Sequence, residues 1–195
     1  MGSVCTITEE IIKTIDEALK DETEPGISLV LTTAKKYNEA NVTLTEYMVN
    51  TKGIPGVYVT LNKPYRTMIK NLDGKVDLRM LIFIDAITKS TGGKINKEDE
   101  CLYLDTMQNL TDLGVAIDQA IRAIPNDEKF LLFDSLSTLL IYSQVGSVSK
   151  FIHFLTGKIR ALGVNGILLS LVHGEEDEFL SQLSMFCDQT IYLDE

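Results

Sequence analysis

The sequence predicts a three-layer, doubly wound α/β fold, with a mostly parallel sheet and helices on both faces. Six short apolar segments have the length of β-strands, and several are apolar on both alternating faces, as expected for strands buried between two helix layers. Helix-compatible segments separate these strands, and such alternation favours a parallel sheet with right-handed crossovers. The length of 195 residues suits one domain, with or without a short appendage.

The elements of this domain are bounded by Gly, Pro and polar residues. The expected strands are 27–31, 57–61, 80–84, 130–133, 166–171 and 190–193, and the expected helices between them are 38–52, 64–73, 107–124, 138–162 and 176–185. Gly53 to Gly56 end one helix ahead of a strand, and Pro64 suits a first helical turn, where its missing N–H costs little. Residues 90–100 are the most loop-like segment. We expect the α/β domain to span residues 25–195.

Residues 1–24 are expected to form an N-terminal amphipathic helix or arm. Ile11, Ile12, Ile15 and Leu19 recur on one face of a helix over residues 6–20. Two interpretations remain open: the helix packs against the main domain, or it docks onto a partner.

The chain is strongly acidic, with 28 Asp and Glu residues against 18 Lys and Arg and a formal net charge of -10. Nucleic-acid binding draws most of its affinity from Lys and Arg that neutralise phosphates, so we expect no nucleic-acid partner. The three cysteines are widely spaced and include no CxxC pair, which argues against a disulfide framework or a zinc site. Because no leader segment or membrane-length apolar run is recognisable, we expect a cytoplasmic protein without a membrane partner.

Ligands in open α/β sheets bind outside the carboxyl ends of the strands, so polar residues that follow strands are the candidates for a binding site. The candidates of this kind are Lys35, Lys36, Asn62, Lys63, Asp134 and His173. Asp134 has an alternative role as a strand-end residue that caps the following helix together with Ser135 or Ser137. His173 precedes the acidic run 175–178, but no Cys or Ser partner stands in an evident arrangement with it. We expect no metal site and no cofactor.

Several segments, taken in order, resemble RecA-like ATPases, particularly the KaiC-like branch. Residues 130–140 read FLLFDSLSTLL and resemble the Walker B strand, which ends in Asp and is followed by Ser-Leu-Ser or a similar run. The other matching segments are GVYVTLNKP at 56–64, LIFIDA at 81–86 and GILLSLVH at 166–173. The resemblance implies a RecA/KaiC-like domain over residues 26–194. It also implies self-association, because members of that family assemble head to tail into rings or filaments.

The chain departs from this family at the phosphate-binding loop, G-x-x-x-x-G-K-[ST]. In that loop glycines bring backbone N–H groups onto the phosphates, Lys neutralises charge and the hydroxyl reaches magnesium. Residues 32–43 read TTAKKYNEANVT, and no glycine occurs between Gly26 and Gly53. Side chains with a Cβ restrict the backbone conformations that such a loop needs, and Glu39 would repel a phosphate.

A second departure concerns the acidic pair that follows the second strand in this branch, where a Glu polarises the attacking water. The matching residues are Asn62 and Lys63, and neither is a general base of that kind. Asp134 is then the only catalytic-type residue that the resemblance carries over.

These departures predict a catalytically inactive RecA/KaiC-like domain, a pseudo-ATPase that works as a regulatory or scaffolding module. Its partners would be proteins: further copies of itself or an active RecA-like relative. One alternative is a nucleotide or small-molecule binder that uses Lys35, Lys36 or Lys63 as a non-standard phosphate site. Another is a residual enzyme that uses Asp134 and His173.

Overall fold

The computed structural model describes residues 7–19, 25–93, 95, 98–172 and 178–193. In this part of the chain a seven-stranded sheet has the order β4-β3-β2-β5-β6-β1-β7, and each of its strand pairs is parallel. The strands are β1 (Ile27–Thr32), β2 (Gly56–Thr60), β3 (Leu81–Asp85), β4 (Cys101–Tyr103), β5 (Phe130–Asp134), β6 (Asn165–Leu171) and β7 (Gln189–Tyr192). The α/β fold class predicted from the sequence is confirmed.

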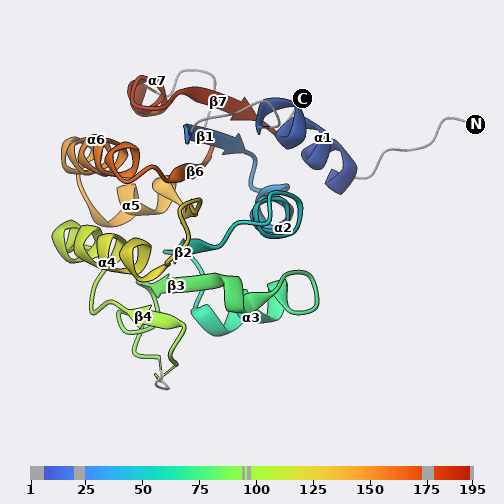
Figure 1. Cartoon of the computed structure of the whole chain (residues 1–195). Helices are drawn as coiled ribbons and strands as arrows, with labels where there is room; N and C mark the ends of the chain where they lie inside the picture. Colours follow the sequence, from blue (N-terminus) through green and yellow to red (C-terminus); the bar gives the residue numbers. More distant parts are fainter. Residues whose placement is uncertain (1–6, 20–24, 94, 96–97, 173–177, 194–195) are drawn as a thin grey trace, which may run out of the picture.

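Helices cover both faces of this sheet. They are α1 (Ile7–Leu19), α2 (Tyr37–Glu46), α3 (Tyr65–Leu72), α4 (Leu110–Ala123), α5 (Leu136–Tyr142), α6 (Val145–Ala161) and α7 (Glu178–Ser184), with a π-helical turn η1 (Tyr47–Thr51) and a 3₁₀ turn η2 (Leu78–Met80). Figure 1 shows α4, α5 and α6 on one side of the sheet and α1, α2 and α3 on the other. None of the described helices is both long and apolar enough to cross a membrane.

The core forms two layers because the central strands are buried on both faces. In β5, Leu131 and Phe133 pack with residues of α4 to α7, whereas Phe130 and Leu132 pack with residues of α1 to α3. This alternation is the normal period of a strand, and it aims the side chain of Asp134, two residues beyond Leu132, toward the layer that contains α2.

Two expected helices differ in detail from the structure, and one strand was not expected. The predicted helix 138–162 is two helices, α5 and α6, because the backbone is extended at Ser143 (φ -140°, ψ 152°). The predicted helix 38–52 is α2 followed by the π-helical turn η1. Strand β4 was not predicted, since three residues after a polar loop are too few to show an alternating pattern.

Helix α1 packs against the body of the domain. Ile11, Ile15 and Leu19 are buried there, and α1 contacts α2 and β7. Ile12 is the member of the predicted stripe that remains 44% exposed. Most of the apolar stripe is therefore already covered within the chain.

Candidate functional site at the carboxyl edge of the sheet

Polar side chains gather at the carboxyl edge of the sheet, between the ends of β2 and β5 and the start of α2. Because Thr60 of β2 is in register with Asp134 of β5, the residues that follow these two strands lie side by side. We call this group the Asp134 cluster; it consists of Tyr37, Asn41, Tyr58, Asn62, Asp134, Ser135 and Thr138. The cluster lies at the edge where ligands bind in open α/β sheets.

Asp134 is the last residue of β5, and its side chain is fully buried. The Tyr37 hydroxyl donates a hydrogen bond to Oδ1, and the Tyr58 hydroxyl lies 3.0 Å from Oδ2. Burial away from water disfavours the charged carboxylate and raises the pKa of Asp134 to about 8. The carboxyl group is therefore largely protonated at neutral pH.

The hydrogen bonds around the Tyr58 hydroxyl also favour a protonated Asp134, because every acceptor oxygen there then has a donor. The single O–H of Tyr58 lies 2.9 Å from Asn41 Oδ1 as well as 3.0 Å from Asp134 Oδ2. If Asp134 is ionised, this one proton serves two acceptors and leaves one of them without a donor. If Asp134 is protonated, it donates to the Tyr58 oxygen, and Tyr58 donates to Asn41. The hydrogen-bond geometry and the desolvation thus favour the same neutral form.

Asn62 joins the end of β2 to α2 and α5. Its Nδ2 group donates to the Tyr37 hydroxyl at 2.5 Å and to Ser135 Oγ at 3.2 Å. Its Oδ1 accepts a hydrogen bond from the Thr138 hydroxyl at 2.5 Å. The donors and acceptors of the Asn62 amide are thus occupied by side chains of the protein itself.

The connection between β1 and α2 is a turn of four residues, Thr33 to Lys36. The Tyr37 N–H donates to the Thr33 carbonyl oxygen at 3.0 Å, and the first turn of α2 brings the Tyr37 ring into the core. Lys35 is exposed at the surface of this turn. Lys36 Nζ donates to the Leu193 carbonyl oxygen at 2.8 Å and lies 3.9 Å from a carboxylate oxygen of Glu10. Lys36 therefore ties the turn to the end of β7 and to α1.

Lys63 bridges the turn after β2 to the start of α2. Its ammonium group donates to Asn38 Oδ1, and partial burial lowers the pKa of Lys63. Its carbonyl oxygen accepts a hydrogen bond from the Thr60 hydroxyl at 2.5 Å. Of the predicted candidates, the structure thus brings Asn62 and Asp134 into one hydrogen-bonded group. It places Lys35, Lys36 and Lys63 around the start of α2, and His173 lies outside the described residues.

The helix-capping role considered for Asp134 is not observed. The N-cap residue of α5 is Ser135, whose side chain makes no capping hydrogen bond and instead lies 3.0 Å from Thr138 Oγ1. The oxygens of Asp134 face tyrosine hydroxyls, as described above, because α2 and β2 place two phenols directly over the end of β5. The peptide bond between Asp134 and Ser135 is cis.

Sequence reasoning missed Tyr37, Asn41 and Tyr58 as members of the cluster. One signal was present: Tyr58 stands inside an apolar strand, and a buried tyrosine hydroxyl usually requires a polar partner. Tyr37 and Asn41 gave no comparable signal, because their position over Asp134 depends on how α2 packs on the sheet.

Asp85 is a second buried aspartate at the same edge, and its surroundings are structural. Its carboxylate accepts hydrogen bonds from the backbone N–H groups of Tyr65 (2.7 Å), Ile87 (2.9 Å) and Thr88 (2.8 Å). These contacts hold the start of α3 against the end of β3. Among the described residues, no group of three or more His, Cys, Asp or Glu side chains could hold a metal ion.

Two cavities lie outside the Asp134 cluster. One of about 200 Å³, beside the carboxyl ends of β3 and β4, is lined by Pro64, Arg66, Thr88, Thr91, Gly93 and Tyr103. The other, of about 180 Å³, lies at the opposite edge of the sheet and includes Gly26, Ile54 and Gly166 in its lining. Arg66 is the charged side chain of the first cavity.

The arrangement of strands and helices is that of KaiC-like proteins. Two solved structures from the archaeon Pyrococcus horikoshii are similar to this chain. The KaiC-like protein PH0186 matches with a TM-score of 0.64 and 16% sequence identity, over 91% of this chain and 75% of that one. The uncharacterized protein PH0321, solved in complex with an unknown peptide, matches with a TM-score of 0.69 and 12% identity, over 94% and 83%. Identities this low establish the fold alone.

By sequence, the chain belongs to a family of unknown function, DUF7504, whose family model matches residues 57–193. No protein of curated function matches the chain in sequence. The matched residues include Tyr58, Asn62 and Asp134 of the cluster, whereas Tyr37 and Asn41 precede them.

Proposed function

We propose that this chain is a catalytically inactive KaiC-like domain that acts as a regulatory or scaffolding module through contacts with other proteins. The observation that carries the proposal is the state of Asp134. Its carboxyl group is buried and its pKa is raised to about 8, and both of its oxygens face tyrosine hydroxyls. Magnesium requires charged or strongly polar oxygen ligands with near-ideal octahedral geometry, and a neutral, occupied carboxyl group is a poor ligand of this kind.

Two further features support the same proposal. The four-residue turn between β1 and α2 has no glycine, and the ammonium group of Lys36 is occupied by the carbonyl of Leu193. Asn62 and Lys63 stand where the resembled ATPases carry an acidic pair, and Asn62 is bound to Tyr37 and Ser135. A water that attacks a phosphate therefore has no carboxylate base at this position.

The protein-interaction part of the proposal is supported by a relative of the same fold. PH0321 was solved in complex with an unknown peptide. A domain that lacks the means to hydrolyse a nucleotide is most simply used for its surfaces, and this chain has exposed apolar side chains on several helices.

Steady-state phosphate release tests the catalytic part of this proposal. The full chain, supplied with ATP and magnesium, should release phosphate at the background rate. The Asp134→Asn variant should give the same rate, because the proposal gives Asp134 no part in catalysis. A wild-type rate that clearly exceeds background and is lost in Asp134→Asn would show an active site and would refute the proposal.

The alternative function, binding of a small molecule at the strand ends, is favoured by the cavity beside Arg66. Its volume of about 200 Å³ is below the range of about 300–1,000 Å³ that is typical of ligand pockets, so a small anion fits it better than a whole nucleotide. Arg66 would supply the positive charge. This alternative requires saturable anion binding that is lost in Arg66→Ala.

A further inference from the structure

The cavity of about 180 Å³ at the amino edge of the sheet lies away from the Asp134 cluster. We call it the amino-edge cavity. The starts of β1 and β6 line it together with the end of α1, the turn η1 and the loop before β5. Its volume is below the range of about 300–1,000 Å³ that is typical of ligand pockets, so it fits a small molecule and excludes a whole nucleotide.

Lys52 brings a positive charge to the amino-edge cavity. Its ammonium group donates to the Leu19 carbonyl oxygen at 2.7 Å and lies 5.8 Å from the centre of the Tyr47 ring. An ammonium group carries three N–H donors, and the Leu19 carbonyl takes one of them. The remaining donors can bind an anionic group in the cavity.

The π-helical turn η1 holds Lys52 in this position. The Lys52 backbone N–H donates to the Tyr47 carbonyl oxygen at 2.9 Å, which is the five-residue step of a π-helix. Met48 inside the turn and Lys52 directly after it both line the cavity. Single π-helical turns are rare and frequently occur at functional sites, so η1 is an independent sign of a site here.

Glu128 and Asn165 bring a carboxylate and an amide to the same cavity. Glu128 belongs to the exposed loop before β5, and Asn165 is the first residue of β6. In the part of the chain that the structure describes, neither side chain takes part in a hydrogen bond or an ion pair. Both are therefore available to a ligand.

The rest of the lining is largely apolar. Leu19, Met48, Ile54 and Ile167 line the amino-edge cavity, and all four are buried. The cavity thus combines one cation, one carboxylate and one amide with an aliphatic surface. A few polar groups beside apolar side chains are the usual composition of a small-molecule site.

We infer that the amino-edge cavity binds a small zwitterion of the α-amino-acid class with an aliphatic side chain. Lys52 binds its carboxylate, Glu128 binds its ammonium group, and the aliphatic residues contact its side chain. A ligand with a charge of only one sign leaves Lys52 or Glu128 without a counter-charge. The inference goes beyond the proposed function, because it gives the domain a ligand at the edge of the sheet opposite the Asp134 cluster.

Occupation of the cavity also fixes the end of α1. Lys52 holds the carbonyl oxygen of Leu19, the last residue of α1, and the Leu19 side chain lines the cavity. A bound amino acid therefore strengthens the attachment of α1 to the domain. Amide hydrogen exchange in α1 should slow when the ligand is present, and exchange in α4 should change less.

Calorimetric titration of the full chain with L-leucine, L-isoleucine, L-valine and L-methionine tests the inference. At least one of them should give saturable heat, with a Kd below about 1 mM. For L-leucine, two analogues separate the charges: 4-methylpentanoate lacks the ammonium group, and leucinamide lacks the carboxylate. Each should bind at least about tenfold more weakly than leucine, because one charged side chain of the site is then unpaired.

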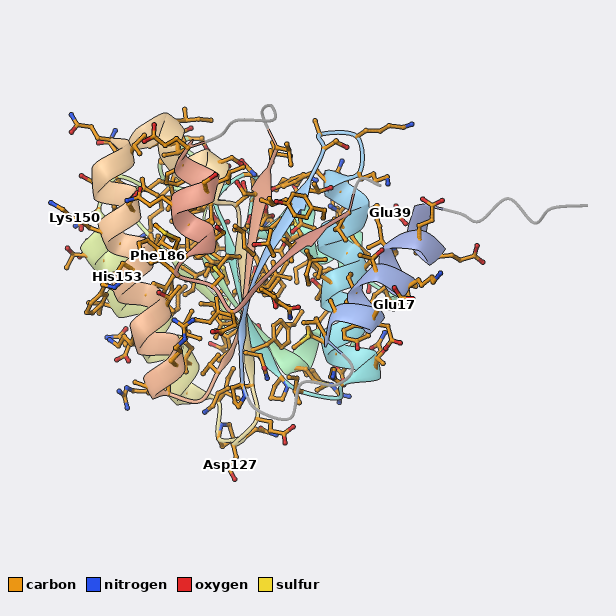
Figure 2. All side chains as sticks on the ribbon, turned by 90° about the horizontal axis from the view of Figure 1, so that it is seen from above. Glu17, Glu39, Asp127, Lys150, His153 and Phe186 are labelled. Atoms are coloured by element: carbon orange, nitrogen blue, oxygen red, sulfur yellow. The ribbon has the colours of Figure 1, made fainter. Side chains whose placement is uncertain are left out.

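Charge-removing variants locate the binding site. Glu128→Gln and Lys52→Gln should each weaken binding at least about tenfold. Asp127→Asn and Lys150→Gln are the matched controls and should retain the wild-type Kd. Figure 2 shows that Asp127 projects away from the domain and that Lys150 lies on the opposite side of the sheet from Glu17 of α1.

Three results would overturn the inference. The first is the absence of saturable binding by all four amino acids up to about 10 mM. The second is equal affinity for leucine and 4-methylpentanoate, which would show that no ammonium group is recognised. The third is a Glu128→Gln variant that binds as tightly as Asp127→Asn. Because Glu128 is exposed, its substitution leaves the fold intact, so this comparison decides even if Lys52→Gln loosens α1.

Discussion

The carboxyl group of Asp134 is held in its neutral form, whereas an aspartate exposed to water at neutral pH is ionised. The carboxyl group is enclosed by the phenols of Tyr37 and Tyr58, and its neutral form satisfies the acceptors around it. This arrangement has a thermodynamic consequence. The pKa of Asp134 is about 8 in the folded chain and about 3.9 in an unfolded one, so the folded state holds an additional proton between these values.

Stability should therefore fall as the pH rises through this window. The contribution of Asp134 is complete below about pH 4 and is lost as the pH approaches 8. Between pH 5 and pH 8.5 the free energy of unfolding should fall by up to about 4 kcal/mol, at about 1.4 kcal/mol per unit. The carboxylates with lowered pKa values, Asp118 and Asp188 among them, give no slope there, because their contribution is complete above about pH 4. Urea denaturation at a series of pH values measures the slope.

The Asp134→Asn variant isolates this effect. Its amide can accept from Tyr37 and donate to Tyr58, as the neutral acid does, so its stability should change little from pH 5 to pH 8.5 and should exceed that of the wild type at the upper end. Asp127→Asn, in the exposed loop before β5, is the matched control and should retain the wild-type slope. A variant at Asp134 that keeps the slope would show that this carboxyl group is not its source.

At the scale of helices and strands, hydrophobic patterning predicted most of the fold. The six predicted strands are all present. The inner strands are apolar runs that are largely buried on both faces, whereas the edge strand β7 is only partly buried, with Tyr192 59% exposed. The hydrophobic pattern did not predict helix boundaries correctly where apolar positions continue through a break in the helix. The apolar positions continue across Ser143, so one helix was predicted where the chain forms two. Within the cluster, Asn62 and Asp134 were identified because they follow strands, whereas Tyr37 is brought over Asp134 by tertiary packing of α2.

Gly56 was predicted only to mark the boundary between a helix and a strand, but in the structure it also has a packing role. It is the first residue of β2 and is in register with Phe130 of β5. A Cβ added at Gly56 would overlap the ring of Phe130, which is fully buried. Gly56→Ala should therefore lower the free energy of unfolding by about 1–3 kcal/mol.

Gly166→Ala is the matched control for this packing effect. Gly166 also lies near the start of a central strand, but an added Cβ there would lie 3.2 Å from Ile27 Cγ1, a contact that a small shift relieves. Urea denaturation should show a smaller loss for Gly166→Ala than for Gly56→Ala. A Gly56→Ala variant as stable as the wild type would contradict the steric account.

At the scale of the whole molecule, the candidate site and the exposed apolar side chains lie on different parts of the domain. The Asp134 cluster occupies the carboxyl ends of β2 and β5, and exposed apolar side chains such as Phe154 and Val115 lie on the helices that cover the sheet. Protein partners would recognise a domain of this kind by the shape and charge of its surface.

Calorimetric titration of the full chain with ATP and magnesium tests the central claim most directly. Because the buried carboxyl group of Asp134 is a poor ligand for magnesium and both of its oxygens face tyrosine hydroxyls, the titration should give only the heat of dilution. Arg66→Ala serves as the second sample, since a small anion bound beside Arg66 would give heat that this variant loses. Saturable binding of ATP with micromolar affinity, unchanged in Arg66→Ala and dependent on magnesium, would contradict the account.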